Sequence, residues 1–216
     1  MASPSENPEF WESFSTDTVS AAGLQNIDVD VDADATVQAE SNSSSTASAE
    51  NVKGDSGAVS TTAFNSGIQA LEYGTNTFKI SADADIKGLA GTTSASSAST
   101  SEGTANAFTT LTDSAGITDV TSLKVGGELS ALGQSINDLS ADAESVIGDA
   151  VGQSQLSDHI YGSDLDNANV SSDAQIQGLA QLNNIADSAT TAGASTATAE
   201  VGHLHGAWLD DLKVGG

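Results

Sequence analysis

The sequence has no cysteine and no arginine, and it is poor in proline and in aromatic side chains. Without cysteine, the chain can form neither a disulfide framework nor a thiolate metal site. Without arginine, it lacks the side chain most used to contact phosphates and base edges, and its net charge of −25 repels nucleic acids and anionic membrane surfaces. The sequence therefore argues against nucleic-acid binding and against adhesion to a membrane.

The sequence also lacks long apolar runs and the common catalytic fingerprints. No segment approaches the roughly eighteen apolar residues needed to cross a bilayer, so no membrane insertion is expected. The first residues have neither a basic region nor an apolar run, so we expect no secretory signal and synthesis in the cytoplasm. There is no phosphate-binding loop, no dinucleotide-binding glycine pattern and no nucleophile elbow, so we expect a protein that is not an enzyme.

The residues that are present are mostly small. Alanine, serine, threonine and glycine make up 107 of the 216 residues. Such a composition is typical either of a disordered chain or of a thin repetitive structure in which small residues stack closely. Apolar positions recur along the chain, which favours the repetitive structure.

The clearest repeat is ISADADIKGLA at residues 80–90, which returns as VSSDAQIQGLA at residues 170–180. The phrase LKVGG also occurs twice, at residues 123–127 and 212–216. Internal repeats of this kind indicate an extended, modular protein rather than one built around a catalytic pocket.

A second pattern divides this repeat. Residues 47–55 and 141–149 share alternating alanines followed by Glu, Val, Gly and Asp at matching positions. We therefore expect a unit of about half of ninety residues, used four times. Small residues at every second position suit strands, so the predicted fold class is mainly β: an elongated repetitive β-solenoid or an intertwined trimeric β-helix.

Residues 128–155 have two interpretations. Their apolar residues fall at alternating spacings of three and four, which is typical of a short helical or coiled-coil segment. Four glycines within or beside the segment disfavour a helix, and residues 141–149 copy a stretch that reads as strand. Helix and strand both stay open for this segment.

These observations divide the chain into four parts. They are an N-terminal docking segment (1–23), a first repeat region (24–127), a connector (128–169) and a second repeat region (170–216). The connector includes the helix candidate, and its residues 156–169 are predicted to be exposed.

An acidic strand opens the first repeat region. Asp28, Asp30, Asp32 and Asp34 alternate with apolar residues, which predicts a strand with one acidic face. Four carboxylates in register could bind calcium, although the stretch lacks the glycine and the terminal glutamate of an EF-hand loop. A solvated strand face is the simpler interpretation.

The N-terminal segment carries a compact aromatic group, Phe10, Trp11 and Phe14. This spacing places the three rings on one face of a short helix. They form either a cap over the end of the core or a docking peptide that inserts into a neighbouring subunit or another protein.

The sharpest candidate metal site is the pair His203 and His205, which glycines flank on both sides. In a strand, both imidazoles point to the same side. Around a threefold axis, three such pairs would give six nitrogen ligands, which suits iron. The alternative is two exposed histidines without a ligand.

The repeat phrases resemble low-complexity virion proteins of marine cyanophages. The resemblance rests on ADIKGLA, SASSASTSEGTANA, IQGLA, TAEVG and LKVGG, and it covers roughly residues 24–216. It implies an acidic, cysteine-free structural protein built from irregular β-repeats. The element GHLHG is similar to the His-x-His elements of trimeric phage fibres, in which histidines from three chains hold an iron ion.

The resulting expectation is a structural protein of a bacteriophage virion, made in the host cytoplasm. It would form a homo-oligomer, a trimer if the histidine prediction is right, within a fibre, tail or neck appendage. Two alternatives stay open: a capsid decoration protein, and a cation-dependent adhesin or glycan-binding module that uses the acidic strand.

Overall fold

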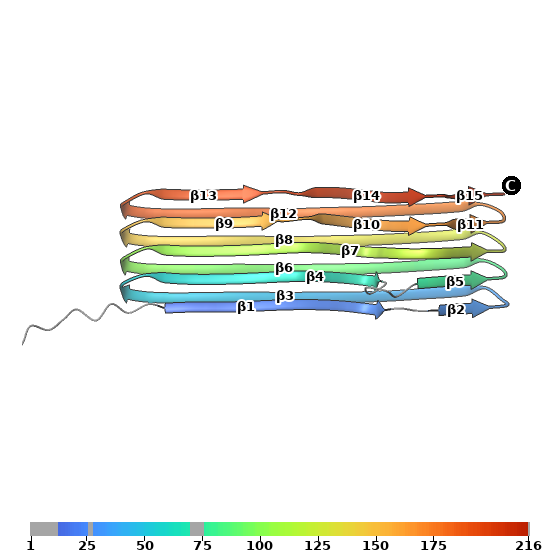
Figure 1. Cartoon of the computed structure of the whole chain (residues 1–216), viewed down its shortest axis with the longest axis horizontal. Coiled ribbons are helices and arrows are strands. Elements are labelled where there is room, and N and C mark those ends of the chain that lie inside the picture. The colour runs from blue at the N-terminus through green and yellow to red at the C-terminus, as the bar shows by residue number, and fades with distance from the viewer. Residues whose placement is uncertain (1–12, 26–27, 70–75, 216) are drawn as a thin grey trace, which may run out of the picture.

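The structure is a computed structural model that describes residues 13–25, 28–69 and 76–215. Within these ranges the chain forms fifteen β-strands and no helix, and all strand pairs are parallel. The strands build two sheets that lie face to face, and the chain passes from one to the other through short turns (Figure 1). The predicted mainly β fold class is confirmed.

The four-stranded sheet consists of long strands in the order β12-β8-β6-β3. Each of them is 19 residues long, and their bounds are β3 (Ala35–Lys53), β6 (Ala84–Glu102), β8 (Leu129–Ile147) and β12 (Ala174–Ala192).

The eleven-stranded sheet follows the order β1-β4-β7-β10-β14, with shorter strands in line with these. Its strands are β1 (Ser13–Gln25), β2 (Asp28–Val31), β4 (Ser56–Gln69), β5 (Asn76–Ile80), β7 (Ala105–Val125), β9 (Ala150–Leu156), β10 (His159–Asp166), β11 (Ala168–Val170), β13 (Ser195–Glu200), β14 (His203–Asp210) and β15 (Lys213–Val214).

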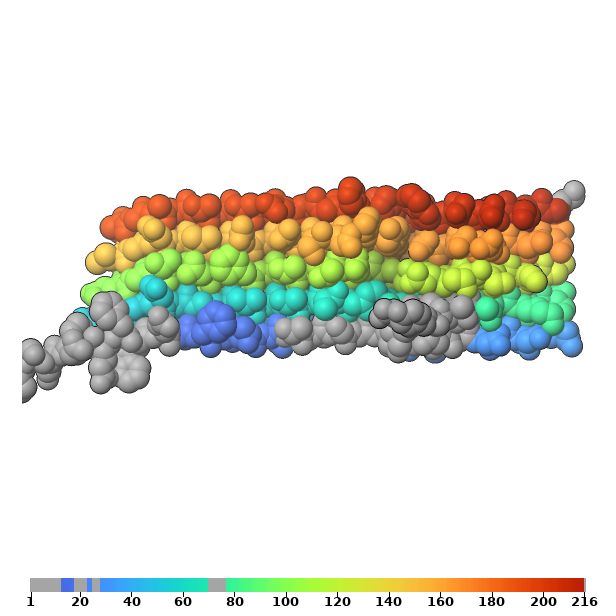
Figure 2. Space-filling model, viewed as in Figure 1, coloured from blue at the N-terminus to red at the C-terminus, as the bar shows by residue number. Residues whose placement is uncertain are grey.

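We call one pass through the eleven-stranded sheet, with the long strand that follows it, a layer. The first layer is β1–β3, the second β4–β6, the third β7–β8 and the fourth β9–β12. The fifth, β13–β15, has no long strand among the described residues. The layers are stacked in chain order, as the colour bands of Figure 2 show.

The pairing register confirms the predicted half-length repeat. Ala35 pairs with Ala84, Ala84 with Leu129, and Leu129 with Ala174, so successive long strands are 49, 45 and 45 residues apart. The ninety-residue correspondence between residues 80–90 and 170–180 therefore spans two layers. Four long strands match the four predicted units.

The core between the sheets is thick at one end of the strands and thin at the other. The thick end is apolar and contains Phe78, Ile86, Leu123 and Val170, all nearly fully buried. The thin end consists of alanines only, stacked from layer to layer: Ala47, Ala49, Ala58, Ala98, Ala105, Ala107, Ala141, Ala143 and Ala150. A third buried cluster, Leu111, Leu139, Leu156 and Ile160, lies between the two ends. Large side chains are thus absent only from the alanine end, which helps to explain why so few suffice.

Several buried hydroxyl groups lie along the strands between the alanine end and the thick end, where they bond to one another. Ser60 Oγ lies 2.8 Å from the Oγ atoms of both Ser45 and Ser94. Ser114 and Ser135 form the same kind of bond, at 2.7 Å. Because each hydroxyl can both donate and accept, these serines are buried without leaving an unpaired polar group.

Glycines allow the two sheets to approach closely between the two ends. A Cβ atom built at Gly88 would lie 2.1 Å from the Gly116 carbonyl oxygen, and one at Gly133 would lie 2.0 Å from the Gly162 carbonyl oxygen. Any side chain here would force the sheets apart, so these positions require glycine.

Acidic residues close the turns by accepting hydrogen bonds from the next layer. Asp55 Oδ1 accepts from the Thr104 N–H at 2.8 Å, and Asp149 Oδ1 accepts from the Ala194 N–H at 2.8 Å. At the other end of the strands, Asp83 Oδ1 accepts from the Glu128 N–H at 2.8 Å. Part of the high negative charge therefore serves to join consecutive layers.

Of the two interpretations of residues 128–155, the strand is confirmed and the helix is wrong. These residues form β8 and β9, and the burial of β8 alternates with a period of two. Of the heptad residues, Leu139 is buried, whereas Ile136 and Val146 point outward and are 45% and 46% exposed. The strand β8 pairs with β6 on one edge and with β12 on the other along its whole length. This pairing stabilises a strand although the apolar residues have a helical spacing.

The reading of residues 156–169 as an exposed connector is also wrong. This stretch contains β10 and β11, and its side chains Ile160 and Leu165 are completely buried. Both strands pair with β7 below and with β14 or β15 above. The polar residues that suggested a loop lie on the outer face of the sheet.

Candidate functional site: a histidine cluster on the outer face

The two histidines predicted as metal ligands lie at the start of β14. His203 pairs with His159 of β10, and His205 pairs with Tyr161. The neighbours of these residues in the same register, Leu204 and Ile160, point toward the core, so the four rings project from the outer face. We call His159, Tyr161, His203 and His205 the histidine cluster.

The rings of the cluster are stacked on one another. The centroid of His159 lies 5.0 Å from that of His203, 5.7 Å from that of His205 and 5.4 Å from that of Tyr161. Trp208 adds an edge-on contact to His205 at 5.3 Å. The structure therefore brings a third histidine, from the neighbouring layer of the same chain, to the predicted pair.

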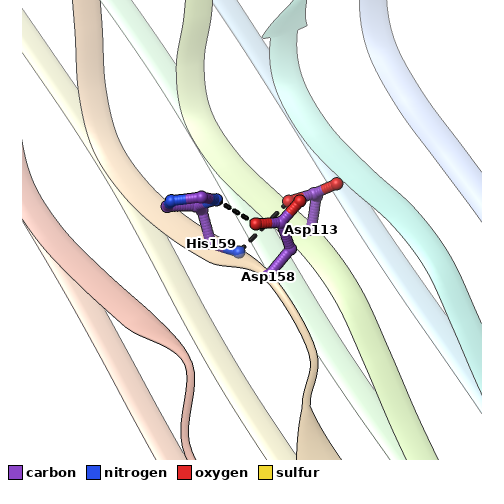
Figure 3. Close-up of side chains that lie close together, drawn as sticks. All are labelled: Asp113, Asp158 and His159. Carbon is purple, nitrogen blue, oxygen red and sulfur yellow. Dashed lines mark hydrogen bonds and ion pairs between the residues drawn. The ribbon is translucent and has the colours of Figure 1, made fainter.

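Two carboxylates adjoin His159 (Figure 3). The Asp158 carboxylate forms an ion pair with the His159 Nδ1 atom, and Asp113 Oδ1 accepts a hydrogen bond from the His159 backbone N–H at 3.2 Å. Ligand atoms of Asp113, Asp158 and His159 lie within 4.8 Å of one another. Burial raises the pKa of the Asp113 carboxyl above its ordinary value, against the opposing effect of the hydrogen bond from His159.

The His159 imidazole and the carboxylates of Asp113 and Asp158 form a donor set that suits a divalent metal. The rings of His203 and His205 lie nearly parallel to that of His159, so their nitrogen lone pairs do not point to one common ion with it. The stacked rings pack on one another without any ion. The cluster holds no serine or cysteine nucleophile beside a histidine, and its histidines lie on an open sheet surface rather than in a pocket.

A repeated tetrapeptide marks the cluster in the sequence. Residues 159–162 read HIYG and residues 203–206 read HLHG, 44 residues apart. This distance is one layer, so the two motifs stack. The sequence interpretation placed His159 in a loop and missed it, although the spacing of the two motifs could have revealed the pairing.

The acidic strand lies where the sequence predicted it, in β2 and the turn that follows. Its carboxylates are exposed, whereas Val29 and Val31 are half-buried against the apolar core, so the two-faced strand is confirmed. Each carboxylate accepts a hydrogen bond from the second layer, and the donors are Thr77 to Asp28, Lys79 to Asp30, Ser81 to Asp32, and the Asp83 N–H to Asp34. These bonds favour the solvated face over a calcium ladder, which stays a prediction.

Of the predicted docking aromatics, Phe10 and Trp11 lie outside the described residues. Phe14 is in β1, opposite Gly57 of the second layer. Its ring is 71% exposed, and it lies against Gly57 so closely that a Cβ atom there would be 2.9 Å from the ring. The short helix expected for this group does not include Phe14, which is in a strand.

A second group of carboxylates lies beyond the glycine of HIYG. The pKa of the Asp164 carboxyl is raised, first by its burial and also by the negative charge of Asp119. Burial raises the pKa of Asp119 as well. Thr118 Oγ1 donates a hydrogen bond to Asp164 at 3.3 Å, which partly offsets the effect.

Comparison with protein-family models, with characterised proteins and with solved structures finds no match to this chain. Among the described residues, no helix is long and apolar enough to cross a membrane.

Proposed function

We propose that this chain is a β-solenoid that serves as a structural component of a bacteriophage virion, in a fibre, tail or neck appendage. The observation that carries the proposal is the regular stacking of layers, in which each layer buries its side chains against its neighbours and the opposite sheet. Solenoids are stabilised in this way, since no single repeat has a core of its own. Both sheets come from one chain, which supports the solenoid over the intertwined trimer.

The dimensions of the molecule fit a mechanical role. A strand of 19 residues spans about 60 Å at ~3.3 Å per residue, whereas layers are only about 4.8 Å apart. One chain is therefore a flat slab whose long axis follows the strands (Figure 1). A longer shaft needs several chains, so self-association is part of the proposal.

The assignment to a virion rests on the resemblance of the repeat phrases to cyanophage structural proteins. The acidic outer surface supports it, because it keeps a repetitive β-structure soluble before assembly. Mass spectrometry of particles purified from the phage that carries this gene tests the assignment. We expect peptides of this chain in the particles at a constant ratio to the capsid protein, and their absence would contradict a virion role.

A metal site at the histidine cluster is a second candidate function. The observation that favours it is the position of the His159 imidazole beside the carboxylates of Asp113 and Asp158, with ligand atoms within 4.8 Å of one another and without a threefold axis. We propose that His159, Asp113 and Asp158 bind a divalent metal together, with the rings of His203 and His205 stacked against His159. Iron at a threefold axis, expected from the sequence, would instead use His203 and His205 of three chains.

Equilibrium dialysis against Zn²⁺ distinguishes these arrangements. If the site lies within one chain, His159→Ala should lower zinc affinity by at least about tenfold, because it removes one ligand of the ion, and His203→Ala should leave the affinity nearly unchanged. A threefold site would lose its metal with His203→Ala only. Equal, weak binding by both variants and the unchanged protein would contradict any metal site here.

A further inference from the structure

Aromatic side chains are confined to one of the two outer faces of the molecule. Of the six aromatic residues that the structure describes, Phe78 is buried in the core. The other five project from the outer face of the eleven-stranded sheet: Phe14, Phe64, Phe108, Tyr161 and Trp208. The four strands of the other sheet contain no aromatic residue. We call the outer face of the eleven-stranded sheet the aromatic face.

The pairing of the strands fixes the outward direction of these rings. Asn65 points into the core, where it donates a hydrogen bond to the Gly91 carbonyl oxygen of the opposite sheet at 2.7 Å, and Ala107 is completely buried. Because successive side chains of a strand point to opposite faces, Phe64 and Phe108 face outward. Their strands β4 and β7 are paired on both edges, so these two rings lie on the surface of the sheet and not at its edge.

Carboxylates lie among the rings. The pKa of the Tyr161 hydroxyl is raised, first by burial and then by the negative charges of Asp164, Asp158, Asp113 and Asp119. Trp208, in the neighbouring strand, is the register partner of Asp164. The aromatic face therefore places ring faces and negative charges side by side.

These carboxylates have no lysine of the chain as a partner. Asp113 and Asp164 are half-buried, so water compensates their negative charge only in part. The chain has no arginine, and none of the ion pairs among the described residues joins a lysine to one of the four carboxylates. A positive charge supplied from outside the chain would be stabilised here.

We propose that the aromatic face binds a basic segment of another protein, with an arginine placed between the Asp164 carboxylate and the rings of Tyr161 and Trp208. A guanidinium group suits this position because it can stack on a ring and donate hydrogen bonds to a carboxylate at the same time. The inference deepens the proposed structural role and rests on it for the identity of the partner as another protein of the same assembly.

The outer face of the four-stranded sheet provides the comparison within the same molecule. It is acidic too, since Asp138, Asp142 and Glu144 of β8 are exposed on it, but it has no rings and its carboxylates are well solvated. Diffuse attraction between opposite charges would draw a basic segment to both faces alike. Only the aromatic face combines charge with rings, so only there should binding distinguish arginine from lysine.

Titration with a tetra-arginine peptide, followed by calorimetry, tests the carboxylate. A solution of about 0.3 M NaCl shortens the reach of diffuse charge attraction to roughly 6 Å, and a chelator keeps metal ions away from Asp113 and Asp158. We expect Asp164→Asn to weaken peptide binding by at least about tenfold, because it removes a charged hydrogen-bond acceptor. Asp142→Asn is the matched control: it removes the same charge from the other face and should change the affinity by less than about twofold.

Comparison with a tetra-lysine peptide tests the rings. The unchanged protein should bind the arginine peptide at least about threefold more tightly than the lysine peptide. Tyr161→Leu should bring this ratio close to one, whereas Tyr161→Phe, which keeps the ring and loses only the hydroxyl, should preserve it. Thermal melting of each variant verifies that the fold is intact.

Three results would overturn the inference. They are equal losses for Asp164→Asn and Asp142→Asn, equal affinity of the unchanged protein for the two peptides, and binding of a neutral glucose oligosaccharide in place of the arginine peptide. The last result would assign the rings to a glycan. All of these measurements use the purified chain, and none bears on whether the chain is present in virions, so the two proposals fail separately.

Discussion

The fourth and fifth layers of this protein have similar inward-facing residues at several matching register positions and very different surroundings. Ile160 and Leu204 occupy the same register position, as do Leu165 and Leu209, yet only the residues of the fourth layer are buried. The comparison shows that burial in this fold is a property of the neighbours and not of the layer itself. A layer that lacks an opposite strand keeps its backbone pairing and loses its core.

The largest difference between the two layers should appear on truncation of the inward leucines. We expect Leu165→Ala to lower the free energy of unfolding by about 2–5 kcal/mol, because it leaves a cavity in a closed core. Leu209→Ala should cost less than about 1 kcal/mol in dilute, monomeric protein, since its side chain is already 42% exposed. Urea unfolding of both variants measures this, and equal losses would contradict the comparison.

The glycines after the histidine motifs should show a smaller difference of the same kind. A Cβ atom at Gly162 would lie 2.2 Å from the Leu179 backbone nitrogen, whereas one at Gly206 would be 3.1 Å from its nearest neighbour. We therefore expect Gly162→Ala to destabilise the fold by about 1–3 kcal/mol and Gly206→Ala to be nearly neutral. Thermal melting checks both, and a neutral Gly162→Ala would show that the sheets can separate at no cost.

The smallest effect concerns charge and depends on pH. The raised pKa of Asp164 means that the folded chain holds this proton more tightly than the unfolded chain. The stabilising effect of protonation is complete below the ordinary carboxyl pKa of about 3.9 and is lost as pH rises through the raised value. Asp164→Asn should therefore stabilise the fold at neutral pH and have little effect below pH of about 4.

The control for this prediction is Asp210→Asn, in the fifth layer. Asp210 is exposed, so we expect its replacement to leave the pH profile of stability unchanged. Unfolding free energies measured across the acid range compare the two variants. If the difference in unfolding free energy between Asp164→Asn and the unchanged protein does not vary with pH, this would contradict the claim that burial raises the pKa of Asp164.

Several features of this fold could be predicted from the sequence. The alternation of residues 28–34 identified a strand with Val29 and Val31 inward, and the internal repeat identified a unit of about 45 residues. Both signals are local or periodic, and the physical reason for each is a spacing along one strand or one layer.

Other features depend on which strands become neighbours, and spacing along the chain does not reveal this. Residues 128–155 have a helical spacing, but pairing on both sides of β8 determines a strand. His159 joins the histidine pair only because β10 lies beside β14.

Amide hydrogen exchange tests most directly whether a layer is stabilised by its neighbours. The long strands β8 and β12 have the same length, but β8 is paired on both edges and β12 on one among the described residues. In dilute protein, peptides from β8 should exchange slowly throughout, and about half of the amides of β12 should exchange fast, because in a strand they point alternately to the two edges. Equal protection of the two strands in dilute protein would contradict the account.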